Sequence, residues 1–434
     1  MNVGLLVAVG ALVFFWSVVA GRVERLDVTG PIVFVLAGMV LGNGPLRTVD
    51  ISVGTTTMHV VAEVTLVLVL FADASRVNLD DLRRSSGLPI RLLAIGLPLT
   101  FALGFALAAV VFTDLPWELA ALLGAVLAPT DAALSAAIVS DESLPQGIRR
   151  AINVESGLND GIATPAVTTF IASAAVAIGA GALHDTASAA GTAAVVDIVG
   201  GAAIGAAIGF GGGRVIVAAR ARGWIVPGGR QVAVLMLAAL SFGVSRELDV
   251  NYFVAAFVAG MAFRAASGVD DAEATELPEL LGRVLSLAVW FVFGAALVVD
   301  ELKLVDWRIA VYAVLSLTVV RMVPVAISMI GSGTGRPATL FIGWFGPRGL
   351  ASVVFGLLIV EELPTADPGV QTILAVISLT VLLSVLAHGL SGRPLSQWMA
   401  RQSAGPPAHA EGGPIRPTAP FGRHHHRQDH HRHP

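Results

Sequence analysis

The chain has 434 residues, of which 55% are hydrophobic and 13% are charged, whereas an ordinary soluble domain has about 25% charged residues. This composition indicates an integral membrane protein. The net charge of −4 lies mostly in loops and does not indicate nucleic acid binding, and the absence of cysteine excludes disulfides and thiolate metal sites.

Apolar runs of membrane-spanning length recur along the whole chain. A helix needs about 20 apolar residues to cross a bilayer, so we predict an all-α polytopic membrane protein with about thirteen transmembrane helices. The predicted spans are 3–20, 29–46, 57–74, 89–112, 117–140, 148–176, 190–219, 230–245, 250–266, 282–299, 307–330, 337–360 and 369–391. The first run lacks the basic residues of a secretory signal and is predicted to be a retained span. The division of 230–266 into two spans depends on the polar stretch 245–249.

Arginine gathers in the loops that follow odd-numbered spans, as at Arg83, Arg84, Arg149 and Arg150. The positive-inside rule therefore predicts an outside N-terminus and a cytoplasmic C-terminus, in the plasma (inner) membrane of a prokaryote. Residues 392–434 shift to Pro, Gly, Arg and His, which predicts a disordered cytoplasmic tail. We expect its histidines to be solvated rather than to form a physiological metal site.

Two spans are interrupted by proline, the fifth at Pro129 and the twelfth at Pro347. Proline removes a backbone donor, and in lipid such a break is tolerated where it lines a cavity or is satisfied by neighbours. The matched breaks predict two inverted repeats of about six helices each, whose broken helices cross near the midplane. Within the transmembrane domain 1–391, the repeats would be about 1–177 and 230–391, linked by the helix 190–219. A pair of ordinary proline kinks is the alternative.

Three carboxylates lie in the apolar runs beside the first break: Asp131, Glu155 and Asp160. Each costs about 2.5–3.5 kcal/mol to insert into a bilayer, so three together indicate a function. Thr130 and Ser156 add hydroxyl oxygens, and oxygen ligands suit a hard monovalent cation. Helix–helix hydrogen bonds and caps are the structural alternative for the two hydroxyls.

Arg348, at the second break, is a buried cation that needs a carboxylate partner. We predict Glu155 as that partner, which leaves Asp131 and Asp160 for ions, although the sequence also allows Asp160. Arg321 is assigned no partner.

The residues Thr130-Asp131, the run Glu155-Ser156-Gly157-Leu158-Asn159-Asp160 and the later Gly346-Pro347-Arg348-Gly349 together resemble the NhaP-type sodium/proton antiporters of the monovalent cation:proton antiporter superfamily. The resemblance extends over roughly residues 3–391. It implies a homodimer of thirteen-helix protomers, each with a dimerisation domain and a six-helix core domain that moves to alternate access.

The resemblance also implies roles for individual residues. Asp160 would bind the proton or the cation, with Thr130, Asp131 and Ser156 completing the Na⁺ site. Glu155 would pair with Arg348 and be held by Asn159. In the family, Asn at this position marks electroneutral exchange, which agrees with a single titrating carboxylate that exchanges one charge for one charge.

Further acidic residues in the third span are candidates for an entrance to the site. The family often has one at the end of this span, where the chain has Asp73; Glu63 lies about three turns earlier. Asp73 could equally be an interfacial cap near Arg76. The lone histidines His59 and His388 are predicted to be structural.

We therefore predict a secondary antiporter for pH homeostasis that exchanges sodium, or lithium, for protons, with no cofactor and no enzymatic activity. A potassium/proton antiporter of the same fold is the first alternative, and a channel built on the same site is another. An intramembrane aspartyl protease, in which two aspartates share a proton, is a remote alternative because it would need neither Arg348 nor Asn159.

Overall fold

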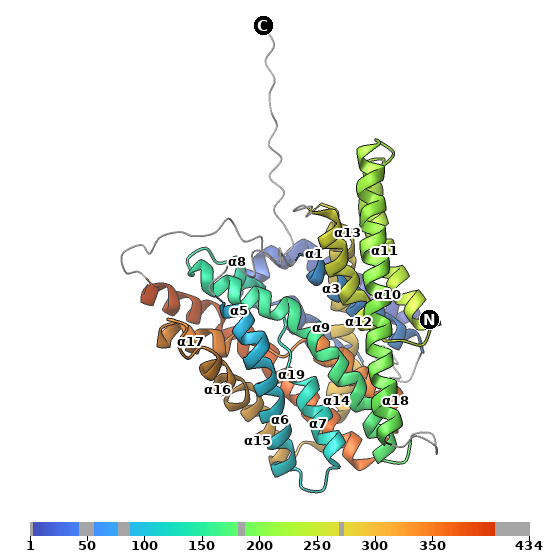
Figure 1. Ribbon diagram of the computed structural model, residues 1–434. Coiled ribbons are helices and arrows are strands. Elements are labelled where there is room, and N and C mark those ends of the chain that lie inside the picture. The colour runs from blue at the N-terminus through green and yellow to red at the C-terminus, as the bar shows by residue number, and fades with distance from the viewer. Residues whose placement is uncertain (1–2, 43–55, 77–86, 181–186, 269–272, 404–434) are drawn as a thin grey trace.

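The computed structural model describes residues 3–42, 56–76, 87–180, 187–268 and 273–403, and within these ranges it contains helices and no strands. Figure 1 shows the helices side by side in one bundle. Their apolar composition makes this arrangement expected, because a membrane-embedded backbone must satisfy its hydrogen bonds internally. The all-helical fold class is confirmed.

The helices occur one after another along the chain. In chain order they are α1 (Val3–Val23), η1 (Glu24–Leu26), α2 (Gly30–Leu41), α3 (Thr56–Arg76), α5 (Leu88–Arg91), η2 (Leu92–Gly96), α6 (Leu97–Val111), α7 (Trp117–Val126), α8 (Ala136–Ser140), α9 (Gln146–Ala177), α10 (Ala187–Ala221), α11 (Gly229–Glu247), α12 (Tyr252–Ser267), α13 (Glu276–Val292), η3 (Phe293–Val298), α14 (Val299–Glu301), η4 (Leu302–Leu304), α15 (Trp307–Leu317), α16 (Val319–Ser328), α17 (Arg336–Trp344), α18 (Leu350–Glu362) and α19 (Pro368–Ser403).

Seven of the described helical segments are long and apolar enough to cross a membrane, and α2, α7 and α12 are shorter apolar helices. The predicted division of 230–266 is confirmed, since α11 ends at Glu247 and α12 begins at Tyr252. Asn251 caps α12 by accepting a hydrogen bond from the Val254 N–H at 3.0 Å. The count of thirteen spans and the inverted repeats remain predictions.

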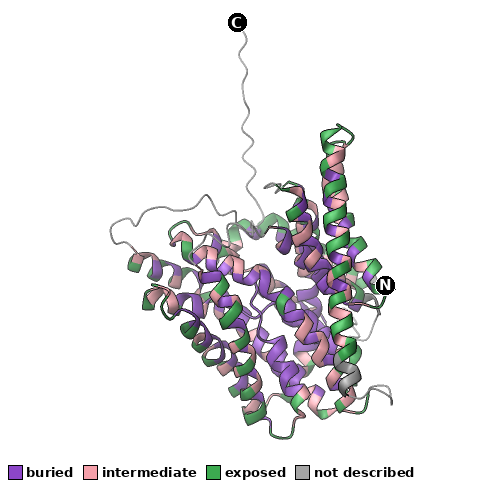
Figure 2. Ribbon diagram, viewed as in Figure 1, coloured by how far each residue is buried: buried purple, intermediate pink, exposed green. Residues whose placement is uncertain are grey.

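The helices pack as two groups. The first group contains α1 to α3 and α10 to α13, and the second contains α6 to α9 and α15 to α19. In Figure 1, α10 and α11 lie on the right and α5, α6 and α15 to α17 on the left. The groups meet where α3 contacts α9 and α18 and where α13 contacts α18. Figure 2 shows buried residues concentrated along these central helices, whereas much of α10 is exposed.

The glycines of α10 form a close contact with α12. Gly201, Gly205 and Gly209 each face a backbone carbonyl of α12. The three carbonyls belong to Asn251, Ala255 and Ala259. A Cβ atom at any of these glycines would overlap the facing oxygen, so small residues let the two backbones approach.

The predicted start of the tail is wrong, because α19 continues without interruption from Pro368 to Ser403. Leu395 and Met399 extend its apolar face and pack in a cluster with Ile138 and Ile148. This packing compensates for the proline at position 394 inside the helix. The remainder of the predicted tail, residues 404–434, lies outside the described part of the chain.

We predict that Gly205→Ala destabilises the protein, because the new methyl group would overlap the Ala255 carbonyl oxygen and overpacking costs about 1–3 kcal/mol. Gly211→Ala on the same helix is the matched control, since no atom lies within 4 Å of its added Cβ. Alanine is the better helix former by about 1 kcal/mol, so the control should be neutral or stabilised. Thermal unfolding in detergent measures both, and equal midpoints would contradict the proposed contact.

Candidate functional site

Both predicted breaks are present, and they lie against each other. Helix α7 ends at Val126 and α8 begins at Ala136, while α17 ends at Trp344 and α18 begins at Leu350. The Asp131 N–H donates to the Pro347 carbonyl at 2.8 Å. This bond satisfies one backbone donor of the first break and one backbone acceptor of the second, as a break inside a membrane requires.

The Asp131 carboxylate accepts hydrogen bonds both within its own break and from the start of α18. One carboxylate oxygen accepts from the N–H groups of Ala133 at 2.6 Å and Leu134 at 3.0 Å. The other accepts from the Leu350 N–H at 2.6 Å, where the positive end of the α18 dipole favours an anion. A Cβ at Gly349 would overlap this carboxylate, which explains the glycine there.

Arg348 supplies a positive charge at the C-terminal end of α7. It is fully buried, and its guanidinium donates to the carbonyls of Ala128 at 3.0 Å and Pro129 at 3.3 Å. These carbonyls follow the C-terminal end of α7, where a cation is favourable. The Arg348 N–H donates to Ser384 Oγ at 2.7 Å. Arg348 is therefore bound to backbone oxygens.

The predicted pairing of Glu155 with Arg348 is wrong, because Glu155 pairs with Arg321. The two Arg321 terminal nitrogens donate to the two Glu155 oxygens at 2.5 and 2.8 Å, and both side chains are 2% exposed. A planar guanidinium suits such bidentate contact with a carboxylate. A Cβ at Gly346 would overlap the Arg321 guanidinium. The glycine in the second break therefore avoids a clash with this pair.

The sequence did not predict that Arg321 pairs with Glu155, because Arg321 lies in neither broken span. To choose between two buried arginines, one must know which of their helices faces Glu155. The available signal was Arg321 itself, a charged residue in an apolar run without an assigned partner. The chain near it is also irregular, since α15 and α16 are separated at Thr318.

Polar side chains of α9 join the first break to the centre of the bundle. Asn159 Nδ2 donates to Thr130 Oγ1 at 2.6 Å, and Thr130 Oγ1 shares a hydrogen bond with Ser156 Oγ at 3.0 Å. Asn159 thus contacts Thr130, and Glu155 is held by Arg321 instead. All three residues of this hydrogen-bonded chain are at least 98% buried.

Asp160 differs from the other two acids in its hydrogen bonding. It is 9% exposed, and its Oδ1 is buried without a hydrogen-bond partner among the described residues, as is Asn159 Oδ1. Leaving a buried acceptor unsatisfied is unfavourable, so a bound proton or cation would stabilise these two oxygens. Asp160 and Ser156 lie one turn apart on α9.

The two predicted entrance acids differ in their surroundings. Asp73 lies beside α9, since a Cβ on Gly157 would be 3.8 Å from the Asp73 Cβ; it is close enough to interact electrostatically with Asp160. Arg76 forms an ion pair with Glu279 of α13, so Asp73 is not the only acid with which Arg76 interacts. Glu63 is 3% exposed and paired with Arg246, which does not favour an entrance role.

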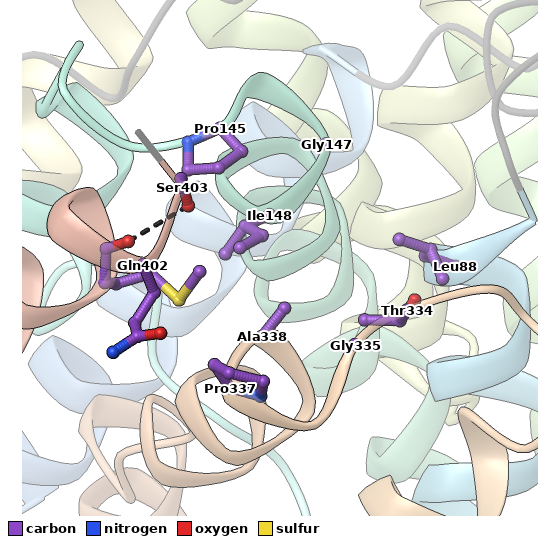
Figure 3. Close-up of a pocket in the computed structure, with 11 residues that line it drawn as sticks. Leu88, Pro145, Gly147, Ile148, Thr334, Gly335, Pro337, Ala338, Gln402 and Ser403 are labelled. Atoms are coloured by element: carbon purple, nitrogen blue, oxygen red, sulfur yellow. Dashed lines mark hydrogen bonds between the residues drawn. The ribbon is translucent and has the colours of Figure 1, made fainter. Parts of the chain in front are cut away.

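The other predicted features lie outside this cluster. His388 contacts the carbonyls of Ser384 and Trp344, each at 2.8 Å, as suits the predicted structural role. A pocket of about 330 Å³ opens between the ends of α9, α17 and α19 (Figure 3). It is lined by mostly apolar residues such as Ile148, Ala338 and Met399 and by none of the predicted ion-site residues.

A helical membrane protein with two interdigitated broken helices and buried acids beside them has the features of a secondary ion transporter. The sequence of residues 10–398 matches the family described as "Sodium/hydrogen exchanger, transmembrane". The chain belongs to this family, whose members are cation/proton antiporters and not enzymes. The predicted resemblance is confirmed.

Solved structures show the same fold. The sodium proton antiporter MjNhaP1 from Methanocaldococcus jannaschii at pH 8 matches with a TM-score of 0.72 and 18% identity, covering 91% of this chain and 98% of that one. A second structure of MjNhaP1, determined by electron microscopy, matches with a TM-score of 0.69, 17% identity and coverage of 92% and 98%.

Curated relatives match over a shorter region. The K(+)/H(+) antiporter NhaP2 of Shewanella sp. (strain ANA-3) is 28% identical over 168 residues, which is 38% of this chain and 28% of the relative. The protein of the same name from Shewanella baltica (strain OS223) is 27% identical over the same length. The match thus spans less than a third of these relatives.

We predict that Arg321→Ala and Glu155→Ala each lower the free energy of unfolding by about 3–5 kcal/mol, because each leaves a buried charge without its partner. The double variant should recover part of this loss. The control cycle combines Arg348→Ala with Glu155→Ala and should show clearly smaller coupling. Unfolding measured in detergent would contradict the pairing if the losses of Arg321→Ala and Glu155→Ala simply add.

Proposed function

We propose that this protein exchanges sodium, or lithium, for protons across the membrane by competition of cation and proton for Asp160. The observation that carries the proposal is the contrast among three buried acids. Asp131 accepts three backbone N–H groups and Glu155 is paired with Arg321, whereas Asp160 retains an unpartnered buried oxygen. One acid is therefore free to change its occupant.

The coupling follows from this single shared group. A carboxylate in a buried site favours the neutral protonated form, and a nearby cation favours the ionised form. Asp160 can thus hold a proton or a cation but not both, and each exchange of occupant couples the two fluxes. A proton gradient then drives cation extrusion without another energy source.

The ligands of the cation would come from the first break and from α9. Hydroxyl oxygens of Thr130 and Ser156 lie 3.0 Å apart, and Asp131 and Asp160 supply carboxylate oxygens. Asp73, beside Gly157, places a further carboxyl group near the site, which would attract a cation when ionised. Asn159, which holds Thr130, would position this set, while Arg348 and Glu155 would stabilise the breaks.

Potassium is the alternative cation, and a specific observation favours it. The NhaP2 relatives are named K(+)/H(+) antiporters, although the match covers 28% of their length. The oxygen ligands alone do not distinguish the ions, because selectivity depends on cavity size and ligand flexibility. Dissipation of an imposed pH gradient in proteoliposomes, measured in turn with sodium, lithium and potassium, separates the two functions.

The proposed assembly and orientation follow the sequence argument. We propose a homodimer in the plasma membrane of a prokaryote, with the N-terminus outside and the C-terminus cytoplasmic. Exposed apolar side chains on α1, including Phe14 at 65% and Phe15 at 64% exposure, suit contact with lipid or with a second protomer. Protease accessibility of each terminus in sealed vesicles tests the orientation.

We predict that Asp160→Asn abolishes exchange while the protein remains folded, because the amide cannot release a proton. Asp114→Asn, at an exposed carboxylate, is the matched control and should exchange at the wild-type rate. Both are measured as cation-dependent proton flux in proteoliposomes. Substantial flux in the Asp160 variant would rule out the assignment.

We predict electroneutral exchange, because Asn159 cannot titrate and Asp131 is held by three backbone donors. Moving one charge through 100 mV is worth about 2.3 kcal/mol, so an electrogenic cycle would shift its reversal point strongly with voltage. Reversal-potential measurements should give zero flux whenever the sodium and proton gradients are equal, whatever the voltage. A voltage-dependent reversal point in the wild type would mean that a second group, Asp131 first, carries a proton.

A further inference from the structure

A second cluster of charged side chains lies at one end of the bundle, far from Asp160. It gathers where α3 begins and α18 ends, which we call the outer end because the predicted topology places it outside. His59 Nδ1 of α3 lies 3.3 Å from a Glu361 oxygen of α18. The His59 side chain is 6% exposed and that of Glu361 is 32% exposed. This contact joins the first helix group to the second.

The His59 side of the contact is anchored within the first group. One turn further along α3, Glu63 accepts a hydrogen bond from Arg246 of α11 and another from the Tyr252 hydroxyl of α12 at 2.6 Å. The Arg246 guanidinium also lies over the Phe242 and Tyr252 rings. These bonds fix the outer turn of α3 to its own group, so His59 presents a fixed partner to α18.

The Glu361 side belongs to the helix that Asp131 caps at its other end. Helix α18 begins at Leu350, whose N–H donates to Asp131, and ends at Glu362. A displacement that carries α18 away from α3 would therefore separate Glu361 from His59. The contact can form only in arrangements in which the two groups are close at the outer end.

The charge of His59 decides how strong this contact is. The acids that interact with His59 are Glu361 and Glu362 of α18. Glu63 lies one turn further along α3, where Arg246 and Tyr252 bind it. A histidine gains a positive charge between about pH 8 and 5, and the contact then becomes an ion pair.

We propose that His59 and Glu361 form a proton-sensitive latch that closes the outer side of the transport site. The proposal rests on the proposed exchange function. Protons at the outer end charge His59, strengthen the contact and hold the two helix groups together there. Exchange would consequently slow when the outer solution is acidic, in addition to any direct competition of protons at Asp160.

The test compares exchange by the full chain in proteoliposomes while the pH of one side is lowered from about 8 to 5, the range in which histidine titrates. The pH of the other side is held constant, and the experiment is then repeated with the two sides exchanged. We expect His59→Gln to run about two- to fivefold faster than wild type at acidic outer pH, the factor that a partly exposed ion pair of ~0.4–1 kcal/mol supplies. The two proteins should match at alkaline pH.

Two further variants make the result specific. The exchanged pair His59→Glu with Glu361→His restores the latch in reverse and should regain the wild-type pH profile. Glu118→Gln removes a carboxylate at the beginning of α7, outside the latch, and should leave the profile unchanged. Loss of acid slowing in the control, or its absence from the exchanged pair, would overturn the proposal.

A second readout does not depend on transport. Hydrogen–deuterium exchange of the last turn of α18 should be slowed at acidic pH in the wild type more than in His59→Gln, after correction for the intrinsic pH effect. If this difference appears in a protein that exchanges no cation, the proposed function fails and the latch stands. If cation exchange proceeds with identical pH profiles in both proteins, the latch fails and the function stands.

Discussion

Two buried charges at the crossing make the site possible. Asp131, on the first break, accepts the N–H at the start of α18, and Arg348, on the second break, donates to the carbonyls after α7. Each charge therefore stabilises the broken end of the other helix, with the sign that the helix dipole favours. Each break thus supplies a cap for the other.

This arrangement separates charges that have partners from an acid that has an unsatisfied oxygen. Asp131, Glu155 and both buried arginines have specific hydrogen-bond partners. Asp160 is the acid next to them with an oxygen left unsatisfied. Desolvation is tolerable for the paired groups because their hydrogen bonds compensate for it. The proposal of exchange at Asp160 rests on this contrast.

Much of the site was predictable because its signals are local. Pro129 and Pro347 mark the breaks, and the spacing of Ser156, Asn159 and Asp160 places them on neighbouring faces of one helix. The partner of Glu155 was not predictable, because Arg321 and Arg348 are equivalent in composition and differ only in the rotation and packing of their helices. The end of α19 was missed for a similar reason: Met399 stabilises it through contacts with α8 and α9, which are distant in the sequence.

The glycine contact between α10 and α12 has a mechanical consequence. Gly201, Gly205 and Gly209 meet Asn251, Ala255 and Ala259 in the same order and with a constant sequence offset, so the two helices run in parallel. Sliding α10 by one residue would bring a side chain against each of these carbonyls, as at Ala202 or Ala206, and close-packed interiors resist such a change. Helix α10 is thus fixed in its axial position relative to α12. If the second helix group shifts along the membrane normal during transport, α10 and α12 would stay in register and behave as one unit.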